Sequence, residues 1–307
     1  MTQESDRQPR TGRVVETVGR RVRVADDEGD RVCFLQGQRA VIGDRVRWRP
    51  AAGGGGVIQG VAPRTTVLSR VDHRGKPRIV AANLTGIVVV CSAIEPPFHA
   101  PLLDRYIVAA RTHGLDVTLC LNKTDLGVPA EVRQALEIRR EAGVPYVETS
   151  AVTSTGLDAL RGHIERMSPS ALVGPSGVGK TSLLAALLPD QDVGPTGPVS
   201  SRDGMGRHTT TRSILLEVGN GAEVADSPGI RTFTPDVLDL AVLRNHFPGL
   251  DDLQCRYRDC QHREDEDGCA APQQAPPQML ASYRALLRDV DGITKRLHPR
   301  NRARRLR

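Results

Sequence analysis

Apolar residues in the first part of the chain recur in short runs with the spacing of β-strands. Turns that contain Gly or Asp separate these runs, for example at 18–20 and 42–44. Short strands at such close intervals predict a small β-barrel, with an OB-fold as the preferred arrangement and an SH3-like barrel as the alternative. The apolar runs are Val14-Val15, Val22–Val24, Val32–Leu35, Val46–Trp48 and Val57-Ile58.

A longer alternation of strand-like and helix-like segments follows between residues 80 and 235. Gly86–Cys91 is an unbroken apolar run, which is typical of a strand that is buried on both faces. Segments with helical spacing alternate with such runs, and this order predicts an α/β domain with a mostly parallel sheet. The expected strands are 86–91, 117–121, 144–147, 171–173, 213–218 and 223–225, and the expected helices are 102–112, 130–142, 157–167 and 182–188.

The remainder of the chain is polar and helical. A Pro- and Gln-rich stretch at 273–278 predicts a break, and Met279–Val290 has helical spacing with Leu280, Tyr283, Leu286 and Leu287 on one face. The whole pattern predicts a multidomain α/β protein. The expected domains are an all-β barrel that binds RNA over 1–70, the α/β domain over 71–235, and a mainly helical domain with a basic tail over 236–307.

Charge and composition narrow the class of protein. No run approaches the roughly 18–20 continuous apolar residues of a membrane span, and Met1–Arg10 lacks the apolar middle of a signal peptide. We therefore expect a cytoplasmic protein that does not associate with membranes. The formal net charge of +6 comes from residues 291–307, which hold seven Lys or Arg residues and one Asp. Such a tail is either simply solvated or a contact for nucleic-acid phosphates.

A complete phosphate-loop pattern, G-x-x-x-x-G-K-[ST], lies at Gly174–Thr181. A short strand is expected before it and a helix after it, which makes a chance match in a loop the weaker interpretation. The glycines let backbone N–H groups point at phosphate oxygens, Lys180 reaches the β- and γ-phosphates, and Thr181 binds Mg²⁺. The expected phosphate contacts are Gly174, Pro175, Ser176, Gly177, Val178, Gly179, Lys180, Thr181 and Ser182.

The tetrad Asn122-Lys123-Thr124-Asp125 directly follows an expected strand. Its aspartate can accept two hydrogen bonds from guanine, whereas adenine would leave the carboxylate unpaired. Its asparagine would brace the loop, and its lysine would lie along the base plane. Ordinary GTPases place the phosphate loop before this tetrad, so the inverted order predicts a circularly permuted GTPase. The expected base contacts are Asn122, Lys123, Asp125, Ser150 and Ala151.

Asp226-Ser227-Pro228-Gly229 supplies a third nucleotide motif, for which a plain turn is the alternative. Asp226 would hold Mg²⁺ through water, and the Gly229 N–H would contact the γ-phosphate. Ile230 follows the glycine, where Ras-like enzymes have a glutamine that orients water. Since an alkyl side chain cannot polarise water, the catalytic group must come from elsewhere.

The glycine-rich segment 204–211 lies between the phosphate loop and the third motif, where the first switch of a GTPase is expected. Its threonines offer hydroxyl groups, so Thr209 and Thr210 are expected to contact the nucleotide and its Mg²⁺. His208 is the candidate for the group that acts on the attacking water, and a structural histidine is the alternative. The expected catalytic residues are therefore His208 and Lys180.

A set of cysteines and one histidine lies close together near the C-terminus: Cys255, Cys260, His262 and Cys269. Three thiolates and one imidazole form a tetrahedral set for structural zinc. The alternatives are a disulfide, which a cytosolic compartment disfavours, or free thiols. The other three cysteines lie in or beside apolar runs and are expected to be small buried hydrophobic residues: Cys33, Cys91 and Cys120.

Together these residues resemble the ribosome small subunit-dependent GTPase A family across nearly the whole chain. The resemblance rests on 122–125, 174–182, 206–211, 226–229 and the cysteine–histidine set, with the turns at 42–46 and 61–64 as further matches. It implies an OB-fold, a permuted GTPase domain and a zinc domain. It also implies GTP or GDP, Mg²⁺ and one structural Zn²⁺ as cofactors.

The resemblance further implies late maturation of the small ribosomal subunit. A monomer would bind the 30S particle and its 16S rRNA, and the particle would stimulate hydrolysis of GTP to GDP and phosphate. Two positions depart from the family pattern. Leu84-Thr85-Gly86 follows Asn83 where many members have an acidic residue and Gln, and Ser227 stands where Thr is commoner. The first departure affects only a nucleotide contact from that turn.

Two other functions fit parts of the pattern. A translation or RNA-binding module that holds GTP but hydrolyses little of it is compatible with Ile230, and turnover with and without small subunits distinguishes it. An ATP-driven kinase or transporter subunit would share the phosphate loop. Asp125 argues against the latter, and competition between GTP and ATP distinguishes the two.

Overall fold

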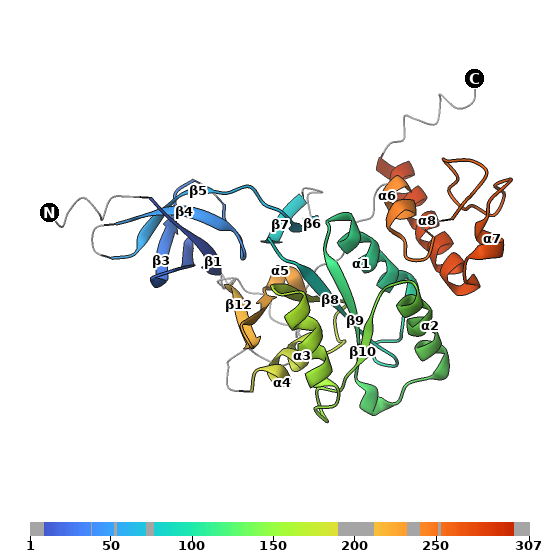
Figure 1. Cartoon of the computed structure of the whole chain (residues 1–307), viewed down its shortest axis with the longest axis horizontal. Helices are drawn as coiled ribbons and strands as arrows, with labels where there is room; N and C mark the ends of the chain where they lie inside the picture. Colours follow the sequence, from blue (N-terminus) through green and yellow to red (C-terminus); the bar gives the residue numbers. More distant parts are fainter. Residues whose placement is uncertain are drawn as a thin grey trace, which may run out of the picture.

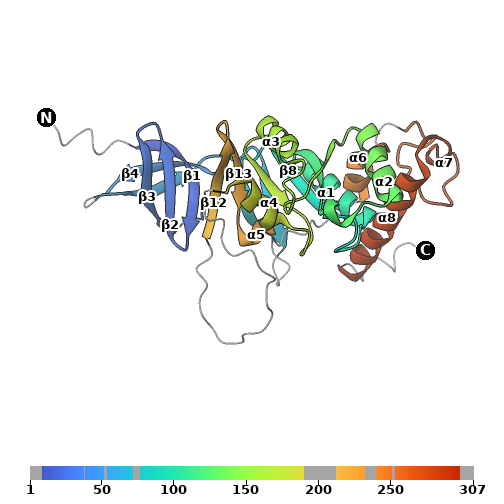
Figure 2. The same ribbon diagram turned by 90° about the horizontal axis from the view of Figure 1, so that it is seen from below.

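The computed structural model of the chain describes residues 9–37, 39–51, 54–71, 77–189, 212–231, 240–250 and 253–297. They form three parts that lie in a row. The N-terminal barrel is at one end, an α/β part is in the middle, and the C-terminal helices are at the other end (Figure 1). Figure 2, which is turned by 90°, shows the same order, so the molecule is elongated.

Five strands close the N-terminal barrel. They run in the order β1-β2-β3-β5-β4, and β4 pairs back with β1, while β3 and β5 are parallel. Because alternate side chains of a strand point to opposite faces, one set fills the barrel, including the fully buried Trp48. The predicted OB-like barrel is confirmed. The strands are β1 (Arg10–Val18), β2 (Arg21–Asp26), β3 (Gly29–Leu35), β4 (Arg45–Pro50) and β5 (Gly56–Val61).

A small antiparallel sheet that the pattern did not predict follows the barrel. It consists of β6 (Val67–Val71) and β7 (Pro77–Ala82). The turn after β7 contains Asn83, whose side-chain Nδ2 donates to the backbone oxygen of Gly43 (2.9 Å) and whose Oδ1 accepts from the backbone N–H of Thr65 (2.9 Å). The family-like position Asn83 is therefore a link between the barrel and the next part of the chain.

The α/β part is a layered sheet with helices on both faces. Its strands lie in the order β10-β9-β8-β11-β13-β12, all parallel except β12. Helices α1 and α2 pack on one face, and α3 and α4 pack on the other. The elements are β8 (Gly86–Ser92), α1 (Ala100–Thr112), β9 (Asp116–Asn122), the 3-10 helix η2 (Thr124–Leu126), α2 (Ala130–Glu141), β10 (Tyr146–Glu148), α3 (Leu157–Arg166), β11 (Ser170–Val173), α4 (Lys180–Leu187), β12 (Arg212–Gly219), β13 (Ala222–Asp226) and α5 (Pro228–Arg231).

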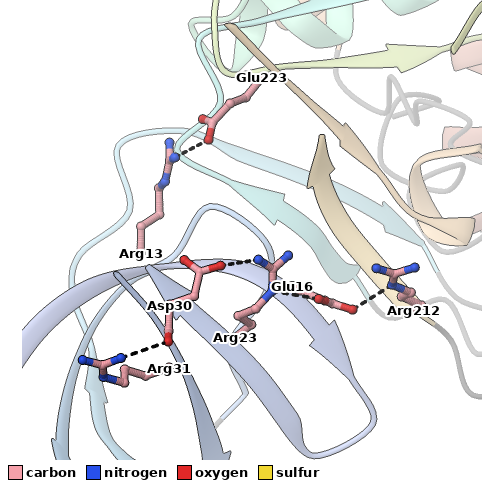
Figure 3. A network of polar contacts seen from close by, with 7 residues as sticks. All are labelled: Arg13, Glu16, Arg23, Asp30, Arg31, Arg212 and Glu223. Atoms are coloured by element: carbon pink, nitrogen blue, oxygen red, sulfur yellow. Dashed lines mark hydrogen bonds and ion pairs between the residues drawn. The ribbon is translucent and has the colours of Figure 1, made fainter. Parts of the chain in front are cut away.

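The barrel and the α/β part share one sheet. β1 pairs antiparallel with β12, with Glu16 opposite Ile214, and the result is an 11-stranded sheet. Ion pairs flank this pairing (Figure 3): Arg13 contacts Glu223, and Glu16 lies between Arg23 (2.9 Å) and Arg212 (2.7 Å). The sequence pattern predicted two separate domains and did not predict their shared sheet.

The C-terminal part consists of α6 (Leu240–His246), α7 (Ala271–Gln274) and α8 (Pro277–Leu297). Its core contains Phe247 and Tyr283, and Val108 of α1 belongs to the same cluster. α8 extends beyond the predicted 279–290 at both ends. At its N-terminal end this is possible because Pro277 is compatible with the first turn of a helix. The mainly helical prediction is confirmed. No helix in the described ranges combines the length and the apolar character that a membrane crossing requires.

The cysteines at 33, 91 and 120 are buried and form no disulfide. Burial raises the pKa of the Cys33 thiol to about 11 and that of Cys120 to about 12. Thiols with pKa values this high are almost entirely protonated near pH 7 and react poorly. The prediction that these three residues are small buried hydrophobic groups is confirmed.

Candidate nucleotide and metal sites

The tetrad lies where β9 ends. Asn122 is the last residue of the strand and is buried, and Lys123 adopts a left-handed φ of 64° that turns the chain into η2. Asp125 lies in η2 and is exposed. The backbone turn therefore directs the Asp125 carboxylate away from the core, as contact with a base requires.

The turn after β10 holds the tetrad in place. Ser150 is fully buried, and its hydroxyl donates to Asp125 Oδ1 at 2.6 Å. Thr124 bonds to the backbone oxygen of Thr149 through its hydroxyl (3.0 Å) and its N–H (3.2 Å). The bond from Ser150 fixes one oxygen of the Asp125 carboxylate. The bonds of Thr124 hold the two turns together, and these are the turns that the sequence assigned to the base.

The phosphate loop connects β11 to α4. Gly174, Gly177 and Gly179 have φ values of 138°, 85° and 92°, in the region that only glycine adopts without strain. A Cβ at Gly174 would lie 2.2 Å from the backbone oxygen of Val90, so a larger residue does not fit there. The Lys180 ammonium donates to the backbone oxygens of Gly174 and Pro175, each at 2.7 Å. The lysine side chain therefore folds back onto the loop that is expected to bind the phosphate groups.

A hydrogen bond joins the tetrad to the phosphate loop. Asn122 Nδ2 donates to the backbone oxygen of Val178 at 2.9 Å, and Asn122 Oδ1 accepts from the N–H of Ala151 at 3.3 Å. A Cβ at Gly179 would lie 2.4 Å from Asn122 Nδ2. The asparagine thus braces the turns after β9 and β10 against the phosphate loop. This contact spans 56 positions of the sequence.

The lysine of the tetrad has a partner that the sequence did not indicate. Lys123 Nζ donates to the backbone oxygen of Glu95 at 2.8 Å. Glu95 belongs to the loop between β8 and α1, which is held by a bond from the Ser92 hydroxyl to the Pro96 oxygen (2.7 Å). The contact uses a backbone carbonyl, which every residue has, and therefore left no signal in the residue types.

The third motif begins at the end of β13, beside β11 in the sheet. Ser227 is buried and its hydroxyl accepts from the N–H of Ile230 at 3.0 Å. The side chain of Ile230 is 1% exposed and packs in the core of the α/β part. Ile230 therefore has a packing role. A carboxylate such as that of Asp226 and a hydroxyl such as that of Thr181 are oxygen donors of the type that binds Mg²⁺.

Several predicted site residues lie outside the described residues. They are the switch residues Thr209 and Thr210, the candidate catalytic residue His208 and the rest of 204–211. The basic tail from 298 onward also lies outside them.

The cysteine–histidine set converges on one point. The four ligand atoms lie within 4.8 Å of one another, and the sulfurs of Cys255, Cys260 and Cys269 are each 3.5 Å from His262 Nδ1. A tetrahedral zinc ion, with bonds of about 2.3 Å to sulfur and about 2.0–2.1 Å to nitrogen, separates these atoms by about 3.5 Å. The donor set therefore fits zinc.

The surroundings of this cluster determine the protonation states of its ligand groups. Burial lowers the pKa of His262, and the nearby Arg244 lowers it further, so the imidazole is neutral as a ligand must be. Burial raises the pKa of the Cys260 thiol, so its thiolate needs a cation beside it. Glu266 braces the loop by accepting from the N–H of Gln261 (2.7 Å) and that of Arg263 (3.1 Å).

Comparison with known sequences places these motifs in a wider set of proteins. The sequence profile described as RsgA GTPase matches residues 61–235. A Pseudomonas syringae pv. tomato protein named small ribosomal subunit biogenesis GTPase RsgA is 40% identical over 299 residues, which are 90% of this chain and 84% of that protein. A Chromohalobacter salexigens protein with the same name is 40% identical over 94% of this chain and 87% of its own length.

Solved structures have the same overall architecture. The crystal structure of YjeQ from Thermotoga maritima superposes with a TM-score of 0.73 at 28% identity and covers 93% of this chain and 99% of its own. The structure of YloQ, described as a circularly permuted GTPase, superposes with a TM-score of 0.69 at 21% identity and covers 95% of this chain. The second likeness concerns the fold alone, and it agrees with the permuted order of motifs.

Proposed function

The chain belongs to the RsgA GTPase family, and we propose that it acts in the late maturation of the small ribosomal subunit. It is a GTP-hydrolysing enzyme with a circularly permuted GTPase domain. The relatives from Pseudomonas syringae and Chromohalobacter salexigens are named for biogenesis of that subunit, which supports the same role here. In this proposal a monomer binds the 30S particle and its 16S rRNA in the cytoplasm, and the particle stimulates hydrolysis.

The hydrogen bond from Asn122 to Val178 is the observation that carries the proposal. It ties the base-reading turn to the phosphate loop, so both ends of one nucleotide can be held at once. We assign guanine recognition to Asp125, whose carboxylate Ser150 orients. A bound base without the guanine donor pair would cover this carboxylate without satisfying its second oxygen, which costs about 1–3 kcal/mol or more for a charged group.

Hydrolysis requires that charge on the phosphates is neutralised and that water is oriented. We assign the first task to Lys180 and to the N–H groups of 174–182, with Thr181 and Asp226 as residues that would hold Mg²⁺. The ion would supply positive charge at the β- and γ-phosphate oxygens. Because Ile230 is buried, we assign the second task to His208, with Thr209, Thr210 and the Gly229 N–H as further nucleotide contacts.

The remaining parts have proposed roles as well. We assign a structural Zn²⁺ to the cysteine–histidine set and RNA contact to the barrel, with domain limits near 70 and 235. On the barrel, Phe34 is 47% exposed, whereas Trp48 is 1% exposed and belongs to the core. One exposed aromatic ring offers little base stacking, so phosphate contacts through arginines should dominate.

The decisive experiment measures GTP turnover against added purified 30S particles at several salt concentrations. We expect stimulation that falls with salt, because phosphate contacts release counterions.

His208→Ala should preserve GTP affinity and lower stimulated turnover by about 10²–10⁴-fold. A matched test of base choice is Asp125→Asn, which should shift preference from GTP to xanthosine triphosphate. GTP turnover that does not change when 30S particles are added would reject the ribosomal role and leave the GTPase assignment intact.

A further inference from the structure

A hollow lies at the end of the sheet opposite to the candidate nucleotide site. β9 carries Asn122 at its carboxyl end and Asp116 at its amino end, and the hollow lies at the amino end. It is open to solvent and has a volume of about 510 Å³, which is within the usual range of about 300–1,000 Å³ for small-ligand sites. We call it the amino-end hollow. Its lining residues that matter here are Arg111, Asp116, Thr118, His163, Arg166 and Met167.

Two arginines reach the amino-end hollow from opposite faces of the sheet. Arg111 lies in the last turn of α1, and Arg166 is the last residue of α3. Arg111 is half-buried and its Nη2 donates to the Ala142 oxygen at 3.4 Å, whereas Arg166 is exposed. Guanidinium groups on two sides of one hollow suit a phosphate, because they offer several N–H donors in a planar fork.

A hydroxyl and an imidazole also line the hollow. Thr118 is 3% exposed, and its Oγ1 lies 3.2 Å from Nδ1 of the half-buried His163. Burial lowers the pKa of His163, and the positive charge of Arg166 lowers it further. The effect of Arg166 on this pKa shows that the His163 imidazole and the Arg166 guanidinium lie close together at the hollow.

The rest of the lining suits the body of a nucleotide. Val117 and Pro145 line the hollow, are apolar and are not fully buried, so they provide a surface for a ring. The exposed carboxylate of Asp116 at the rim can only accept hydrogen bonds when it is ionised, so it favours a ligand with hydroxyl or amino donors. An anion with an apolar ring and donor groups is a nucleotide unit.

We propose that the amino-end hollow binds one nucleotide unit by its phosphate, between Arg111 and Arg166. This site is separate from the phosphate loop, since the two lie at opposite ends of the parallel strands. The nucleotide unit has two possible sources with the same chemistry, a free mononucleotide or one residue of an RNA strand.

The test uses the full-length protein saturated with GDP, so that the phosphate loop is occupied. Calorimetry with adenosine monophosphate should detect a second binding event, and adenosine without phosphate should bind at least about tenfold more weakly, because it lacks the charged contacts. A single-stranded tetranucleotide forms the other arm. Tighter binding of the mononucleotide indicates a free ligand, and tighter binding of the tetranucleotide indicates RNA.

Variants locate the event. Arg166→Ala and Arg111→Ala should each weaken binding by about tenfold, the effect of losing one charge-assisted contact. Arg140→Ala is the matched control, because Arg140 is exposed, pairs with Glu137 and does not line the hollow. Arg166 is exposed, so its variant should remain folded even if the Arg111 variant does not. No second event, or equal binding by Arg166→Ala and the wild type, would overturn the proposal.

Discussion

The α/β part is joined to its two neighbours by different kinds of contact. The N-terminal joint comprises 13–18 and 42–43 against 81–83, 212–214 and 223. Backbone bonds make its sheet continuous, since β1 pairs with β12 and the Ala82 N–H donates to the Ile42 oxygen at 2.9 Å, and partly exposed ion pairs flank these bonds. At the C-terminal joint, where α6 and α8 meet α1 and α2, side chains form the polar contacts. There the Asp104–Arg139 pair is buried between α1 and α2, and Ser282 of α8 donates to Asp104 at 2.5 Å.

The difference determines which substitutions each joint tolerates. Backbone bonds do not depend on residue type, so the N-terminal joint should resist changes of side chain and fail when the backbone is forced to move. A buried ion pair depends on both partners, because removal of one leaves an uncompensated charge. The C-terminal joint should therefore be sensitive to single side chains.

Zinc removal should produce the largest effect. α8 contacts the cysteine–histidine loop through Arg284, which donates to the His262 oxygen at 3.0 Å, so loss of the loop removes support from the helix. Cys260→Ser should release zinc and cost much of the order in 253–297, since structural zinc contributes about 10 kcal/mol or more in small peptides. Metal analysis and hydrogen exchange measure both effects. If hydrogen exchange in α8 were unchanged in the variant and GTP binding were retained, the metal would not be coupled to the C-terminal joint.

Arg139→Ala should destabilise the protein by about 3–5 kcal/mol, because it leaves the fully buried Asp104 without its two bonds of 2.6 and 2.7 Å. Urea denaturation followed by helix content measures the change. The neighbouring Arg140→Ala is the control and should leave stability unchanged, since Arg140 lies exposed on the surface of α2. A small effect at Arg139 would mean that the apolar cluster alone holds the C-terminal joint.

Gly43→Ala tests the N-terminal joint through its backbone. Gly43 has a φ of 83°, and a Cβ there would lie 2.0 Å from the Ala82 oxygen, so the barrel must shift away from β7. Strain of this kind costs about 1–3 kcal/mol. Thermal unfolding measures it, and Gly19→Ala is the matched control, because Gly19 also has positive φ but an added Cβ would meet nothing within 4 Å. Equal losses in the two variants would show that conformation alone, rather than the close approach to β7, causes the effect.

The sequence predicted the chemistry of the local motifs but neither of the two joints. The phosphate loop, the tetrad and the cysteine–histidine set consist of residues close in sequence, so their chemistry could be inferred before their geometry. The buried set at the C-terminal joint could not be inferred, because Asp104 and Ser282 are 178 positions apart and aspartate and serine are common on surfaces. The pairing of β1 with β12 left no signal either, since any strand edge offers the same backbone groups.

Glu16→Gln should have the smallest effect, at most about 1 kcal/mol, because its partners Arg23 and Arg212 are partly exposed and water screens the pairs. Burial alone would raise the pKa of Glu16, but hydrogen bonds from the two arginines outweigh it and the pKa is lowered. The contribution of Glu16 to stability is therefore present above its ordinary pKa of 4.5 and disappears as pH falls through the lower pKa of the folded state.

Urea denaturation of the wild type and the Glu16→Gln variant at pH 7 and pH 3 measures this, and the two curves should converge at the lower pH. Glu137→Gln, which breaks an exposed pair within one helix, is the control and should leave both curves unchanged. If Glu16→Gln destabilised the protein as much as Arg139→Ala, the N-terminal joint would rest on side chains after all, and the distinction between the joints would be wrong.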